Sequence, residues 1–95
     1  MGLVAGQARV LLLTDQKSTL EFQMQRICQK EMNLSAQAQN FMNDDNIQKQ
    51  VFELNKQLEL QQKQIEAQHK MIETELESAK KVVDKNIESS FKYFA

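Results

Sequence analysis

The scarcity of turn-forming residues constrains this chain more than any other feature. Its 95 residues include no proline, and the only glycines are Gly2 and Gly6. All-β folds need a turn roughly every 8–12 residues, usually built with glycine, proline, asparagine or aspartate. Beyond Gly6 the chain has one such cluster, Asn43-Asp44-Asp45-Asn46. The sequence therefore excludes sandwiches, barrels and Rossmann-type folds, and it predicts a single all-α domain of elongated shape.

Apolar periodicity predicts the first helix, which we place at residues 15–42. Apolar residues recur at alternating steps of three and four, which is a heptad pattern. The line consists of Leu3, Gly6, Val10, Leu13, Lys17, Leu20, Met24, Ile27, Glu31, Leu34, Ala38 and Phe41. Because Thr14-Asp15 and Ser18-x-x-Glu21 are both plausible helix starts, the latter as a capping box, residues 1–14 are predicted to be a separate N-terminal segment. A continuous helix from about residue 3 is equally compatible with the pattern.

The second helix is predicted over residues 47–94, after a turn at 43–46 in which Asp45 provides the N-cap. The apolar residues of this helix first repeat every seven residues. Beyond Ile72 the repeat lengthens towards eleven residues, which would straighten the helix. The positions are Val51, Leu54, Leu58, Gln61, Ile65, Gln68, Ile72, Leu76, Ala79, Val83, Ile87, Phe91 and Phe94. Four pairs of oppositely charged residues at i,i+4 spacing would each stabilise the helix by about 0.2–0.5 kcal/mol. They are Glu59–Lys63, Glu66–Lys70, Glu77–Lys81 and Glu88–Lys92.

Two antiparallel helices joined at this turn form a coiled-coil-like hairpin without a closed core. Large apolar residues remain outside the two lines and need other neighbours: Phe22, Cys28, Met32, Met42, Phe52, Leu60, Met71, Val82 and Tyr93. We therefore expect the hairpin to be completed by oligomerisation, with many copies of the chain. The expected assembly contacts are Leu20, Met24, Ile27, Leu34, Phe41, Ile72, Leu76, Val83, Ile87, Phe91 and Phe94.

Charge and composition exclude several partners. Twelve basic residues against thirteen acidic ones leave no basic surplus, so nucleic-acid binding is not expected. The apolar stretch Leu3–Leu13 is too short and too polar to span a bilayer, and it lacks the basic region and cleavage site of a signal peptide. We expect an extracellular or cell-surface assembly exported without a cleaved classical signal, or alternatively a cytoplasmic protein.

No motif for catalysis or for metal binding is present. His69 is the only histidine and Cys28 the only cysteine, and there is no glycine-rich loop to hold phosphate. The carboxylates have lysines at helical spacing, which is typical of solvated ion pairs. We predict a protein that is not an enzyme and has no cofactor, and we interpret His69 as an exposed or polar-layer residue.

Four residues near the C-terminus, Asp84, Ile87, Phe91 and Lys92, have a spacing that resembles the end of type III secretion needle subunits. The small helical hairpin is also similar to inner-rod and flagellar-rod subunits. This resemblance implies that the C-terminal helix lines a hollow tube and that both ends of the subunit make polymer contacts. It also implies export machinery or a chaperone as partners.

The sequence thus favours a structural, self-assembling subunit that forms a filament, tube or rod and belongs to an export or surface apparatus. The alternative is a cytoplasmic coiled-coil adaptor or export chaperone in a small closed oligomer. A third hypothesis is membrane-surface association through Gly2–Leu13. That segment has Arg9 as its single cation, fewer than the basic face of such helices usually carries.

Overall fold

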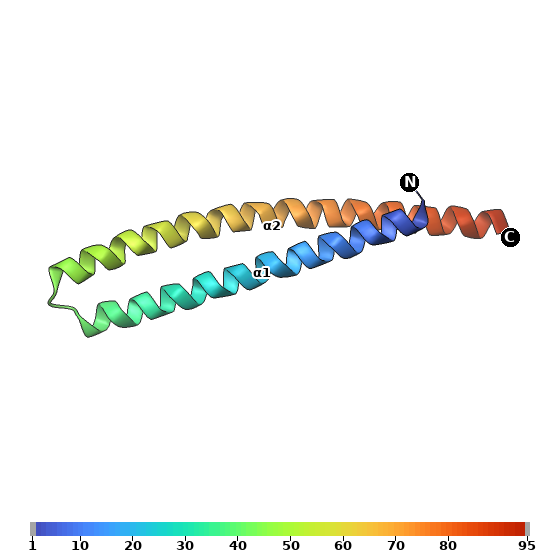
Figure 1. The fold of residues 1–95 in the computed structure, drawn as a ribbon. Helices are drawn as coiled ribbons and strands as arrows, with labels where there is room; N and C mark the ends of the chain where they lie inside the picture. The colour runs from blue at the N-terminus through green and yellow to red at the C-terminus, as the bar shows by residue number, and fades with distance from the viewer. Residues whose placement is uncertain (1, 95) are drawn as a thin grey trace.

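The computed structural model of the chain describes residues 2–94, and it describes side chains as far as residue 93. Two helices, α1 (Leu3–Asn40) and α2 (Asp45–Phe94), lie antiparallel side by side (Figure 1). The molecule measures 75 × 16 × 13 Å and its radius of gyration is 21.3 Å. A compact domain of this length would have a radius of gyration of about 12 Å. The predicted all-α, elongated hairpin is therefore confirmed.

Helix α1 is continuous from Leu3, so the separate segment predicted at residues 1–14 is wrong and the alternative of an early start is correct. Ser18 and Glu21 lie within the helix and do not form a capping box. The hydroxyl of Thr14 donates to the carbonyl of Val10 at 2.7 Å, which satisfies this polar side chain inside the helix. Because nothing between residues 7 and 40 breaks a helix, the apolar line of residues 3–13 simply continues into residues 17–38.

The turn lies at residues 41–44, two residues before its predicted position at Asn43–Asn46. Asp44 Oδ1 accepts hydrogen bonds from the backbone N–H groups of Asn46 and Ile47, at 3.0 and 3.2 Å. Asp44 is therefore the N-cap of α2, and Asp45, to which the sequence assigned that role, is the first residue of the helix. Either aspartate is chemically able to cap, and the second one complements the positive end of the helix dipole.

A side chain of α2 caps the C-terminal end of α1 by hydrogen bonds. Gln48 Nε2 donates to the carbonyl oxygens of Ala38 and Phe41, both at 2.9 Å, and these carbonyls lie in and just beyond the last turn of α1. The N–H of Phe41 also bonds to the carbonyl of Gln37 at 3.1 Å. The chain reversal is thus held by Asp44 on one side and by Gln48 on the other.

The predicted heptad line of α1 forms the seam, by which we mean the surface buried between the two helices. Its residues from Leu3 to Ala38 are buried or half-buried, whereas Phe41 at its end is 50% exposed. The largest cluster joins Leu13 with Leu76 and Ala79. The buried apolar side chains are few, namely Leu13, Ile27, Val51, Leu58, Leu76 and Ala79, and each of them keeps 2–8% of its surface exposed. The hairpin therefore has a thin core.

The seam of α2 contains several residues that are not in the predicted apolar line. It uses Asn55, Gln62 and His69, while Leu54, Gln61 and Gln68 are exposed. The seam residues are Val51, Asn55, Leu58, Gln62, Ile65, His69, Ile72, Leu76, Ala79, Val83 and Asn86. These positions keep steps of four and three throughout, so the predicted change to an eleven-residue repeat is wrong. Once His69 replaces Gln68 in the line, the extra four-residue step at Ile72 disappears.

Helix α2 is longer than its partner and runs past it. Gly6 lies beside Val83, so antiparallel counting places Leu3 level with Asn86. Residues 87–94 therefore extend beyond the start of α1 by about 12 Å, as the red end of the ribbon shows (Figure 1). We call these residues the overhang.

Candidate functional site

The described residues contain no group of three or more histidine, cysteine, aspartate or glutamate side chains placed to hold a metal ion. Within the same residues, neither helix is long and apolar enough to cross a membrane. Cys28 is exposed on α1. The features that stand out are instead a polar cluster in the seam, apolar side chains at both ends, and two long faces of different chemistry.

The polar cluster links the helices near the middle of the rod. His69 Nε2 lies 3.1 Å from Glu21 Oε1 on α1, and His69 Nδ1 lies 3.5 Å from Glu73 Oε1 on its own helix. Lys17 Nζ lies 3.8 Å from the same Glu73 oxygen. The His69 side chain is 18% exposed, so it is a polar-layer residue as interpreted from the sequence. A polar layer of this kind selects one register of two helices at a cost in stability.

The residues expected to make assembly contacts fall into two groups. Seven of them are in the intramolecular seam: Leu20, Met24, Ile27, Leu34, Ile72, Leu76 and Val83. Phe41, Ile87 and Phe91 are on the surface, with 50%, 47% and 75% exposure. The side chain of Phe94 is outside the described part of the chain. The exposed group, rather than the seam, is available to another molecule.

Exposed large apolar side chains occur along the whole rod, and those of the described aromatic residues, except Phe22, lie towards its two ends. The end bearing the overhang carries Ile87, Phe91 and Tyr93, and the turn end carries Phe41 and Met42. Phe52, two turns into α2, is also exposed, with Lys56 Nζ 4.6 Å from its ring centroid. Exposed aromatic clusters usually mark contact surfaces.

The two ends also differ in charge. Residues 80–92 carry four lysines against Asp84 and Glu88, whereas residues 41–53 carry three acidic residues against Lys49. Of the four predicted i,i+4 pairs, Lys81–Glu77 at 3.7 Å and Lys92–Glu88 at 3.2 Å form within the described residues. The end bearing the overhang is therefore net basic and the turn end is net acidic.

The long faces of α2 have different chemistry. One face, here called the charged face, presents lysines at Lys49, Lys56, Lys63 and Lys70 and glutamates at Glu59, Glu66 and Glu73. The opposite face has no charged residue between Gln50 and Met71. With the matching residues of α1 we call it the glutamine face, and it comprises Gln16, Gln23, Lys30, Gln37, Gln50, Leu54, Gln57, Gln61, Gln64, Gln68 and Met71.

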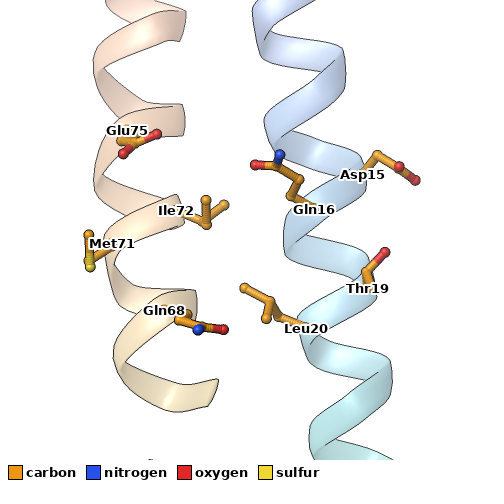
Figure 2. A pocket seen from close by; sticks show the side chains of 8 residues that line it. All are labelled: Asp15, Gln16, Thr19, Leu20, Gln68, Met71, Ile72 and Glu75. Carbon is orange, nitrogen blue, oxygen red and sulfur yellow. The ribbon is translucent and has the colours of Figure 1, made fainter. Parts of the chain in front are cut away.

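Two open grooves lie along the glutamine face, between the helices. The first encloses about 350 Å³, and its floor is formed by Leu20 and Ile72, which point towards each other with Gln16 and Gln68 beside them (Figure 2). The second encloses about 370 Å³ nearer the turn and is lined by Leu34, Leu54 and Leu58 among others. This face was not predicted from the sequence, because the predicted apolar line places Leu54, Gln61 and Gln68 in the seam.

Comparison with known proteins found no matching family model, no matching curated protein and no matching solved structure. The fold and its surfaces define the class of the chain as an elongated, coiled-coil-like helical hairpin.

Proposed function

We propose that this protein is a structural subunit that assembles end to end into a filament, tube or rod by helix packing. The observation that carries the proposal is the complementarity of the two ends of the rod. The end that bears the overhang presents Ile87 and Phe91 and is net basic over residues 80–92, and the turn end presents Phe41 and Met42 and is net acidic over residues 41–53. The chemistry of each end therefore suits the opposite end of another copy.

A contact between unlike ends is heterologous, and a heterologous contact continues indefinitely unless its rotation closes a ring. On this proposal the overhang of one subunit packs against Phe41, Met42 and Phe52 of the next. Each large apolar side chain withdrawn from water contributes roughly 1.5–3 kcal/mol. Two or three such side chains would contribute about 3–9 kcal/mol per contact, which offsets part of the entropy that association costs.

The exposed surface of the single hairpin supports assembly. Its accessible area is 7615 Å², against about 5,700 Å² for a compact monomer of this mass. The excess of about 2,000 Å² is comparable to the area that a stable interface buries. The hairpin also keeps Lys17, Glu31, Asn55, Gln62 and His69 in its seam, which weakens its own core.

The proposed place of the subunit in an export or surface apparatus is supported by the resemblance of its C-terminal segment alone. Of the four residues in that pattern, Ile87 and Phe91 are exposed on the overhang, and Lys92 pairs with Glu88 beside them. Exposure at this end is compatible with polymer contacts. The cytoplasmic adaptor hypothesis has no observation of its own here and is treated as an outcome of the test.

The test compares Phe91→Ser with Phe22→Ser. Both phenylalanines are exposed, at 75% and 60%, but Phe22 lies in the middle of the rod. We expect the wild-type chain and Phe22→Ser to form filaments in negative-stain micrographs as the concentration rises. For Phe91→Ser the critical concentration should increase more than tenfold, while circular dichroism remains helical.

Two results would contradict the proposal. A wild-type chain that stays a small oligomer of fixed mass over a hundredfold range of concentration would favour the adaptor. Equal assembly of the two variants would show that the overhang is not the growing contact.

A further inference from the structure

We propose that His69 is a pH-sensitive clamp that selects which side of α2 faces α1. In its protonated form His69 bridges the two helices and holds the observed seam. Without that proton the middle of α2 rotates, so that Leu54, Gln61 and Gln68 turn towards α1. Such a device needs a group that changes charge and an element with two arrangements. The proposal concerns the single hairpin, so it goes beyond the proposed function and requires neither the overhang nor growth into a filament.

The first argument is the placement of both ring nitrogens of His69 against carboxylates. Nε2 lies 3.1 Å from Glu21 Oε1 on α1, which is a hydrogen-bond distance, and Nδ1 lies 3.5 Å from Glu73 Oε1 on α2. A neutral imidazole has one N–H and one lone pair, so it donates to one glutamate and turns its lone pair towards the other. The imidazolium has an N–H on both nitrogens and is attracted by both glutamates. The bridge between the helices is therefore complete only in the protonated form.

The charges around the imidazole favour the same form. The charged groups within one turn of this level on the two helices are Lys17, Glu21, Glu66, Lys70 and Glu73. Two of the carboxylates contact the ring, whereas Lys17 Nζ lies 3.8 Å from the Glu73 oxygen. An unfolded chain holds neither glutamate beside the imidazole, so protonation stabilises the folded hairpin more than the unfolded chain. By linkage, the bridge is present at low pH and is lost as the pH rises through the range of about 5 to 8 in which histidine titrates.

The second argument is that α2 has two possible seams of similar quality, which share Val51, Leu58, Ile65 and Ile72. The observed seam adds Asn55, Gln62 and His69, and the alternative seam adds Leu54, Gln61 and Gln68. At the first of these levels leucine is more apolar than asparagine, and at the second level both residues are glutamine. Hydrophobic burial therefore favours the alternative seam. The contacts of His69 with the two glutamates act in the opposite direction and favour the observed one.

The third argument is that open space lies where the alternative residues would move. Gln68 extends towards Leu20 across the first groove (Figure 2), and Leu54 and Gln61 line the second groove. The two grooves enclose about 350 and 370 Å³ between the helices. Because adjacent residues are separated by about 100° around a helix, a rotation of about 50° is sufficient to exchange the two sides of α2. The same rotation moves His69 out of the seam.

The rotation requires no change in the buried cluster near the open end of the hairpin. Both seams continue through Leu76 and Ala79, which pack with Leu13 of α1. In the rotated state the steps from Gln68 to Ile72 and from Ile72 to Leu76 are both of four residues, which is a local eleven-residue repeat. Such a repeat relaxes the left-handed supercoil of a heptad pattern. The turn of the helix is therefore absorbed around Ile72, while the cluster stays in place.

The experiment compares thiol reactivity at two neighbouring glutamines. In a Cys28→Ser background, which removes the native thiol, we introduce Gln61→Cys or Gln62→Cys and measure the rate of alkylation at a concentration below filament formation. Gln61 is exposed and Gln62 is half-buried in the observed seam. At about pH 6 we expect the thiol at position 61 to react at least about fivefold faster than the thiol at position 62. Between about pH 6 and pH 8 this ratio should fall at least about threefold. The ratio at each pH cancels the general increase in thiol reactivity with pH.

His69→Gln is the matched control, because an amide is polar and does not titrate. In this variant the ratio should be low and the same at both pH values, and Glu21→Gln should reduce the pH dependence at least about twofold. A ratio that does not change with pH when His69 is present, or that changes equally in His69→Gln, would overturn the inference. A fall in the ratio together with a loss of helical circular dichroism would show unfolding rather than rotation and would also contradict it. Because filament growth is assayed separately through Phe91, either proposal can fail while the other stands.

Discussion

Gly6 and Val83 are in such close approach that a Cβ atom added at Gly6 would lie 3.1 Å from Val83 Cγ2. This contact sets the distance between α1 and α2 at the open end of the hairpin. Gly6 is one of the few buried positions of α1, and it occupies a heptad site where the other residues are mostly large. Glycine is used here for its lack of a side chain, because no described residue of the chain has a positive φ.

The first prediction concerns this contact. Gly6→Leu should destabilise the hairpin by about 1–3 kcal/mol, because the added side chain overpacks the seam against Val83. Combining Gly6→Leu with Val83→Ala should recover most of the loss. Urea unfolding of the two single variants and the double variant gives the coupling energy. A coupling energy of zero would show that the two residues do not share the same space.

The second prediction concerns the N-cap of α2. Asp44→Ala removes the acceptor for the N–H groups of Asn46 and Ile47 and should cost about 1 kcal/mol of unfolding free energy. Asp45→Ala is the matched control, since Asp45 acts only through the helix dipole and should cost less than about 0.5 kcal/mol. Thermal or urea unfolding measures both variants. Equal losses would mean that the cap is shared or lies at Asp45.

The third prediction concerns Glu31, a polar residue of the α1 seam. Its Oε1 atom is buried and has no hydrogen-bond partner among the described residues. By the register, Glu31 is level with Leu58. Glu31→Met should therefore stabilise the hairpin by about 1–3 kcal/mol, since an unsatisfied buried oxygen is removed. Glu66→Met, at an exposed position of α2, should change stability by less than about 0.5 kcal/mol.

The fourth prediction concerns His69. Glu21 and Glu73 are 47% and 49% exposed, so both remain hydrated if the imidazole is removed. His69→Leu should raise the unfolding free energy by about 1 kcal/mol, because it replaces a polar layer with an apolar contact level with Leu20. His69→Ser, which provides neither packing nor a link between the helices, should lower it. The opposite result for the two variants would show that the polar cluster is a net source of stability.

Much of this fold could be read from local pattern. Without proline, and with glycine confined to Gly2 and Gly6, the chain has few alternatives to helix, and the heptad line of α1 directly identified its buried side. The reversal near residue 43 followed from the single cluster of turn-forming residues. The exposed apolar residues, from Phe22 to Tyr93, were also correctly separated from the seam. These features depend on neighbours three to four residues apart, which a sequence displays.

The side of α2 that faces α1 was decided only by the tertiary structure. Leu54 is more apolar than Asn55, so hydrophobicity favours the side of α2 that the structure leaves exposed. Gln61 and Gln62 are the same residue type, so hydrophobicity does not distinguish the two sides at that level. The structure turns His69 inward, where Glu21 and Lys17 of α1 provide charged groups for His69 and Glu73. It also leaves Leu54, Gln61 and Gln68 outside on the glutamine face. The sequence determined that there are two helices with a heptad seam, whereas the choice of seam residues required the partner helix, because burial of a polar side chain depends on what lies opposite it.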